Sequence, residues 1–111
     1  MATQGLVTVK SGDKVLMKVV AGCDGNNAQK LADKLKDTWP VDAFKAYQLA
    51  QEVGFGDEDC LVAITISEAV SGGDKVGDEE LGPLYRTTFQ QPEFNPRWEN
   101  GTADHVIVIN V

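Results

Sequence analysis

Residues that carry chemistry or cross-link small proteins are scarce in this sequence. It holds two cysteines and one histidine among 111 residues. Two cysteines are too few for the disulfide framework of a small secreted domain. One histidine and two separated cysteines do not supply the usual ligands of a tetrahedral zinc site. We therefore predict no metal site, and no motif in the sequence predicts a cofactor.

Long apolar runs are also missing. No stretch approaches the roughly 20 apolar residues of a membrane-spanning helix. The first five residues, MATQG, lack the basic and apolar regions of a secretory signal. Together with the low cysteine content, these absences predict a cytoplasmic protein whose two thiols are reduced.

Positive charge is in short supply as well. Lys and Arg number 10 against 17 Asp and Glu, which gives a formal net charge of −7 at pH 7. A protein of this charge is repelled by the phosphates of nucleic acids and anionic membranes. We therefore expect no nucleic-acid or membrane partner. The acidic clusters at 57–59 and 74–80 do not match a calcium-binding loop and indicate a solvated surface.

What remains is the composition of one globular domain. The chain is 42% hydrophobic and 24% charged, which is ordinary for a soluble fold. Its length lies near the commonest domain size, so residues 1–111 are predicted to form a single domain.

The first half of the chain predicts two strands followed by two helices. The β-rich runs at 6–9 and 14–21 flank a short break that contains glycine, a pattern typical of a hairpin. Apolar residues recur with helical spacing over 28–39 and again over 43–53. In the second strand, Val15, Met17, Val19 and Ala21 are expected to share the core face.

Polar and special residues mark the ends of these helices. Asn26 or Asn27 is expected to cap the first helix with its side chain, and Asp42 the second. Pro40 ends the first helix because the residue before a proline avoids helical angles. Gly54 is expected to end the second in a left-handed conformation.

The second half is predicted to contain fewer regular elements. Residues 60–67 are apolar on both faces and predict a central strand, and 105–111 have the same character. Between them lies a long irregular segment, 71–104, in which only 84–89 has the composition of a short edge strand. The predicted order is β-β-α-α-β-(β)-β. We therefore expect an α+β fold with a mainly antiparallel sheet of four to five strands and two helices packed on one face.

The face of the sheet away from the helices is expected to be apolar. The residues assigned to it are Leu16, Val20, Leu61, Ala63, Val106 and Val108. An open patch of that size is unfavourable in a monomer. Either the long segment or a second subunit must cover it, and we predict a homodimer built on this face or through that segment.

Aromatic residues and arginines gather between positions 85 and 98. The candidate ligand- or partner-binding residues are Tyr85, Arg86, Phe94, Asn95, Arg97 and Trp98. Aromatic rings and arginine are common in interface hot spots and ligand pockets. In the alternative interpretation, the aromatic residues anchor a long loop to the core, and the arginines pair with neighbouring glutamates.

A second candidate site lies around Cys23. The turn at 22–27 joins a strand to a helix, and a helix start can lower the pKa of a thiol. Cys23 as nucleophile, His105 as base and Asp24 or Asn26 as orienting group would make a small hydrolase or transferase. In the alternative interpretation, Cys23 is a small turn residue, and Gly25 is needed there for a positive φ. If the second and third strands are antiparallel neighbours, Cys23 and Cys60 lie close enough for a reversible disulfide.

The residues favour a non-catalytic function over an enzymatic one. We predict a small cytoplasmic binding or protein-interaction module that assembles as a homo-oligomer, with the segment 85–98 as its working surface. Its partner is itself, a small ligand or another protein, including the other subunits of a larger complex. The small hydrolase or transferase at Cys23 remains the alternative.

Overall fold

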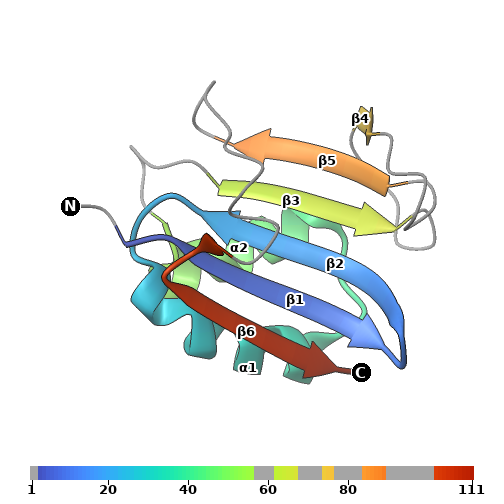
Figure 1. Cartoon of the computed structure of the whole chain (residues 1–111), viewed down its shortest axis with the longest axis horizontal. Helices are drawn as coiled ribbons and strands as arrows, with labels where there is room; N and C mark the ends of the chain where they lie inside the picture. The colour runs from blue at the N-terminus through green and yellow to red at the C-terminus, as the bar shows by residue number, and fades with distance from the viewer. Residues whose placement is uncertain (1–2, 57–61, 68–73, 77–83, 90–101) are drawn as a thin grey trace.

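The part of the chain that the structure describes folds into a mixed β-sheet with two α-helices packed on one face (Figure 1). The computed structural model describes residues 3–56, 62–67, 74–76, 84–89 and 102–111. Its elements are β1 (Gly5–Ser11), β2 (Lys14–Ala21), the 3-10 turn η1 (Gly25–Asn27), α1 (Ala28–Thr38), α2 (Ala43–Val53), β3 (Val62–Ser67), β4 (Asp74–Val76), β5 (Leu84–Phe89) and β6 (His105–Asn110).

The six described strands lie in the order β4-β5-β3-β2-β1-β6. β6 pairs with β1 in parallel, and every other neighbouring pair is antiparallel. The α+β class is confirmed, whereas the predicted number of strands is too low and the sheet is mixed. A parallel pair such as β1 and β6 needs a long crossover connection. No local pattern in the sequence predicts at which edge of the sheet the strand after such a connection will pair.

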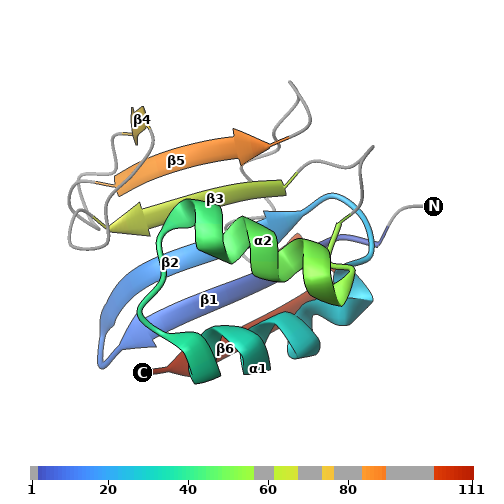
Figure 2. The same ribbon diagram turned by 180° about the vertical axis from the view of Figure 1, so that it is seen from behind.

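Both helices cover the same face of the sheet, as predicted (Figure 2). α1 contacts β1 and β6, α2 contacts β3, and the two helices contact each other. The core lies between the two layers. Its fully buried side chains from the sheet are Val7, Val9, Met17, Val19, Ala21 and Ile64, and those from the helices include Leu31, Ala32, Leu35, Ala43, Ala46 and Ala50.

A bulge in β2 divides the predicted core face of that strand. Val9 pairs with Met17, whereas Lys10 pairs with Val15, so Leu16 is an extra residue in β2. An extra residue shifts the alternation of side chains along the strand. Val15 is therefore only half-buried, although Met17 on the other side of the bulge is fully buried as predicted.

The predicted helix ends are mostly confirmed. The last residue of α1 is Thr38, and the Trp39–Pro40 bond that follows is cis. The Asp42 side chain caps α2 by accepting a hydrogen bond from the backbone N–H of Lys45 at 2.8 Å. Gly54 ends α2 with φ of 73°.

The predicted side-chain cap of α1 is wrong. Asn27 occupies the N-cap position, but its side chain makes no capping hydrogen bond. Its Nδ2 instead donates to the carbonyl oxygen of Gly54 at 2.8 Å. The Asn27 side chain thus ties the start of α1 to the end of α2, because tertiary packing offers it a non-local acceptor.

Regular structure also occupies part of the segment predicted to be irregular. β5 confirms the strand predicted at 84–89, but β4 pairs along its outer side, so β5 is not an edge strand. β4 is three residues long and lies among glycines and charges, which leaves no periodic signal. β6 is an edge strand rather than a central one, although its composition resembles that of central β3.

Within the part of the chain that the structure describes, neither helix is long and apolar enough to cross a membrane.

Candidate interaction surface

β6 lies at one edge of the sheet that the described residues form (Figure 1). The backbone N–H of His105 donates to the carbonyl oxygen of Gln4, just before β1, at 3.1 Å. The backbone N–H of Val111 donates to the carbonyl oxygen of Lys10 in β1 at 2.9 Å. Alternate residues of a strand direct their N–H and C=O groups to opposite edges. The main-chain groups of Val106, Val108 and Asn110 therefore face away from β1, where no described strand pairs with them.

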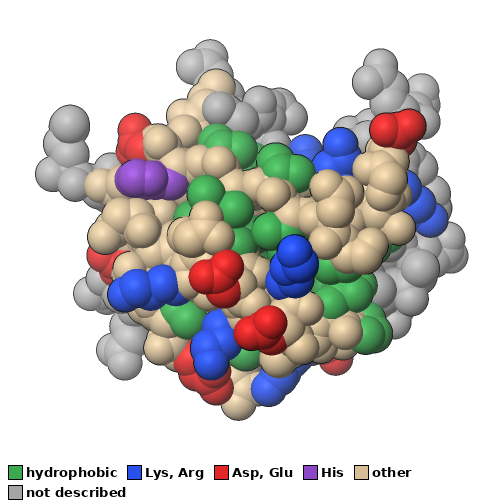
Figure 3. Space-filling view, turned by 90° about the horizontal axis from the view of Figure 1, so that it is seen from below, with side chains coloured by type: hydrophobic (Ala, Val, Ile, Leu, Met, Phe, Trp, Pro, Cys, Tyr) green, Lys and Arg blue, Asp and Glu red, His purple; other side chains and the backbone are tan. Residues whose placement is uncertain are grey.

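Exposed valines accompany this edge. Val106 is 43% exposed, Val108 55% and Val111 42%. Their neighbours Ile107 and Ile109 are half-buried and pack against the core below α1. β6 therefore alternates between core and exterior, and two of its exterior positions, Val106 and Val108, are apolar where a solvated strand would carry polar residues. Seen from the side of this edge, apolar side chains lie near the single histidine, with charged groups of both signs beside them (Figure 3).

We call Val106 and Val108, together with the edge of β6 that faces away from β1, the β6 margin; Val111 follows β6, and its backbone N–H faces β1. The rest of the outer face is different, since Val20 in β2 is 0% exposed and Leu6 in β1 is also buried. Thr8 and Thr65 on the same face are buried as well. The centre of the outer face is therefore buried within a single chain. Of the apolar patch predicted there, the exposed described residues are Val106 and Val108 at the β6 edge.

Of the remaining residues assigned to the outer face, Leu16 is half-buried at the bulge. Ala63 is in register with Val20, and Leu61 lies outside the described residues.

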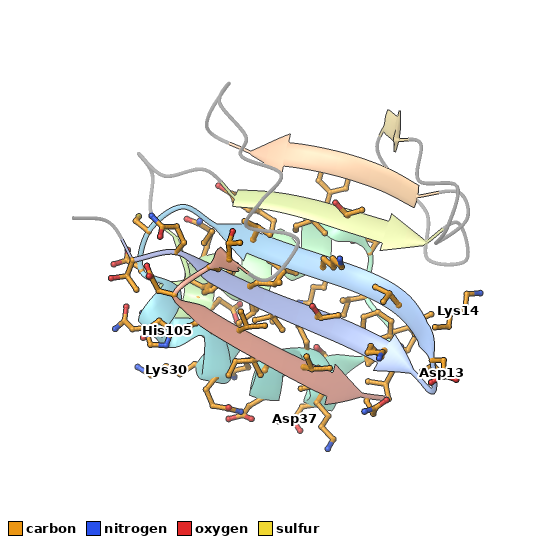
Figure 4. All side chains as sticks on the ribbon, in the orientation of Figure 1. Asp13, Lys14, Lys30, Asp37 and His105 are labelled. Carbon is orange, nitrogen blue, oxygen red and sulfur yellow. The ribbon has the colours of Figure 1, made fainter. Side chains whose placement is uncertain are left out.

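Charged residues of α1 flank the β6 margin. Lys30, Asp33, Lys34 and Asp37 are all exposed. Figure 4 shows Lys30 and His105 at the same end of the molecule, and Asp37 farther along toward the C-terminus. Because α1 packs against β6, any segment that pairs with this edge must pass beside these side chains.

The structure places only two of the six candidate residues predicted at 85–98. Tyr85 and Arg86 are adjacent in β5, and successive strand positions belong to opposite faces of the sheet. Arg86 is paired in register with Asp74 of β4, an opposite-charge neighbour that the sequence analysis did not identify. Phe94, Asn95, Arg97 and Trp98 lie outside the described residues.

The structure also places the candidate catalytic residues Cys23, Asp24 and His105. β1 lies between β2, which ends just before Cys23, and β6, which begins at His105. The end of β2 and the start of β6 are therefore two strand spacings, about 10 Å, apart. Cys23 is disulfide-bonded, so the prediction of two reduced thiols is wrong at this position. Its Sγ lies 3.7 Å from Oδ2 of Asp24, and a sulfur held in a disulfide is not available as a nucleophilic thiolate.

Glycine is required at position 25, in the turn after Cys23, for a different reason from the one predicted. Gly25 does not have a positive φ, and Asp24 takes the left-handed conformation with φ of 57°. Gly25 is required for space instead. A Cβ on Gly25 would lie 2.3 Å from the backbone carbon of Gln4, so the turn and the start of β1 could not approach as they do.

No group of three His, Cys, Asp or Glu residues within the described ranges could hold a metal ion. No model of a known protein family matches the chain, and no curated protein or solved structure is significantly similar to it.

Proposed function

We propose that the protein is a small non-catalytic interaction module and that the β6 margin is its interaction surface. The observation that supports this proposal is a strand edge with which no described strand pairs and whose exterior side chains, Val106 and Val108, are apolar and exposed. Natural proteins usually protect such an edge with charges, prolines or bulges. The run from Val106 to Ile109 has none of these.

The chemistry of the margin favours pairing by strand addition. Two half-exposed valines, Val106 and Val108, cannot supply the roughly 800 Å² per partner that stable interfaces bury. The outward N–H and C=O groups of β6 can add main-chain hydrogen bonds, while the valines contact alternate apolar side chains of the added strand. The fitting partner is therefore an extended segment with β-branched residues on one face.

A second copy of this chain is the partner we propose first. Its own β6 has the required composition, and a two-fold pairing would place the same patch on both subunits. An antiparallel register centred on Ile107 would set Val106 of one copy opposite Val108 of the other. Since α1 packs against β6 in each copy, the two α1 helices would approach each other, and their exposed Lys and Asp residues would lie in the contact.

Sedimentation velocity across about 1–200 µM protein tests the dimer. We expect the wild type to be dimeric at the upper end, and Val108→Lys to be monomeric because it puts charges into the apolar contact. Phe44→Lys is the matched control, since Phe44 is 63% exposed on α2, away from the β6 margin. A monomeric wild type at every concentration, or a Val108→Lys variant that still dimerises, would refute the dimer through β6.

The wider proposal has its own test. A tagged chain incubated with extract of its host should retain a protein that Val108→Lys loses and Phe44→Lys keeps. If the wild type is monomeric yet shows this pattern, the module binds another protein. If both tests fail, the β6 margin is not an interaction surface. Cytoplasmic placement stays a prediction, and the disulfide at Cys23 fits an oxidising environment better.

A further inference from the structure

The disulfide bond of Cys23 is a second feature of the molecule, separate from the β6 margin. Cys23 follows β2 by two residues and is disulfide-bonded. The sulfur of a disulfide carries no proton, so its 3.7 Å contact with Asp24 is not a hydrogen bond from a thiol. The turn around it is tightly held, because the backbone N–H of Gly25 donates to the carbonyl oxygen of Thr3 at 2.9 Å.

The pairing of β2 with β3 indicates where the partner sulfur lies. The two strands are antiparallel, with Met17 opposite Ile66, Val19 opposite Ile64 and Ala21 opposite Val62. In each pair the two residue numbers add to 83, so extending the register by two residues sets position 23 opposite position 60. Position 60 holds the second of the chain's two cysteines.

We propose that Cys23 and Cys60 form an intrachain, redox-sensitive disulfide that joins the end of β2 to the start of β3. Cys60 lies outside the described residues, and its assignment rests on this register together with the cysteine count. Residues directly opposite in an antiparallel pair have Cα atoms about 4.5–5.5 Å apart. That separation lies within the range of protein disulfides.

The position of this link sets what it controls. The loop that it closes contains the whole helical layer, α1 and α2, which leaves the sheet after β2 and returns to it at β3. Oxidation therefore lowers the conformational entropy of the unfolded chain and stabilises the fold in which α1 and α2 pack on the sheet. Reduction by a dithiol transfers two electrons and two protons to the bond, leaves two thiols on the protein and converts the dithiol into its own disulfide. The helical layer is then held by packing alone.

Mass spectrometry of the whole chain, after iodoacetamide in denaturant, tests the link. We expect air-oxidised protein to take up no alkyl group, and dithiothreitol-treated protein to take up two. Protease digestion without reductant should yield one peptide pair joining Cys23 to Cys60. Two alkylated thiols in the oxidised protein, or a disulfide between two chains, would overturn the proposal.

Thermal unfolding supplies the second measurement. Oxidised wild type should melt about 10 °C above the reduced protein, given the size of the closed loop. The double variant Cys23→Ser, Cys60→Ser should melt at one temperature regardless of reductant. An equal melting temperature for oxidised and reduced wild type would refute control of the helical layer by this link. Neither measurement depends on dimerisation, so the β6 proposal stands or falls separately.

Discussion

Gly5 and Gly25 lie against each other without space for a side chain on either. A Cβ on Gly5 would lie 2.6 Å from the Cα of Gly25 and 2.6 Å from Cε2 of Phe55. Phe55 is fully buried and follows the last residue of α2 by two positions. The start of β1, the turn before α1 and the exit from α2 therefore meet at this pair of glycines, close to the first residue of β6.

The first prediction concerns this glycine contact. Gly25→Ala should lower the free energy of unfolding by about 3 kcal/mol, because the added methyl group meets backbone atoms that cannot move aside. Gly12→Ala is the control. Gly12 has φ of 61° and nothing within 4 Å of an added Cβ, so only the left-handed backbone is strained, at about 1 kcal/mol. Urea denaturation measures both, and equal losses would contradict the packing role of Gly25.

A second prediction separates bridging from capping at the start of α1. Asn27→Ala removes the hydrogen bond to Gly54 and should cost about 1 kcal/mol of unfolding free energy. The neighbouring Asn26 is exposed, and Asn26→Ala should change stability by less than about 0.5 kcal/mol. The same urea titrations compare the two variants. A larger loss at Asn26 would show that the helical turn depends on a cap that the structure does not contain.

The third prediction tests the cap of α2. Asp42→Ala should cost about 1 kcal/mol, since the side chain satisfies the free N–H of Lys45. Asp37 is the matched aspartate, exposed near the C-terminus of α1. There a negative charge opposes the helix dipole, so Asp37→Ala should be neutral or slightly stabilising. Far-UV circular dichroism during thermal melts distinguishes the two, and destabilisation of similar size at both positions would refute the assignment.

The fourth prediction examines the outer face of the sheet. Val20 is fully buried although it lies away from the helices, whereas Val108 is largely exposed. Val20→Ala should therefore cost about 2 kcal/mol. Val108→Ala should cost less than about 0.5 kcal/mol at concentrations where the chain is monomeric. Chemical denaturation at low protein concentration provides the comparison. A small effect at Val20 would mean that the outer face is open in solution, as the sequence alone suggested.

Local chemistry made most of the secondary structure predictable. The helical spacing of Leu31, Ala32 and Leu35 places them in the core, where all three are fully buried. Asp42 caps α2 as its position before an apolar-periodic segment predicts. These predictions succeed because a helix period and a cap depend on residues only a few positions apart.

The errors share a non-local cause. Gly25 was assigned a turn conformation, but its requirement comes from Gln4 and Gly5 in another element. Asn27 is predicted to cap α1, but its side chain donates to the carbonyl oxygen of Gly54 at the end of α2. A contact partner distant in sequence leaves no periodic trace at either position.

The sequence by itself determined an acidic α+β fold with two amphipathic helices and apolar strands, because composition and periodicity act locally. Only the tertiary structure decided that β6 lies in parallel beside β1 at an edge, with Val106 and Val108 exposed. The same alternation of apolar residues suits a central or an edge strand. Which one it becomes depends on where the chain crosses the sheet, and that is settled only by the packing of the whole domain.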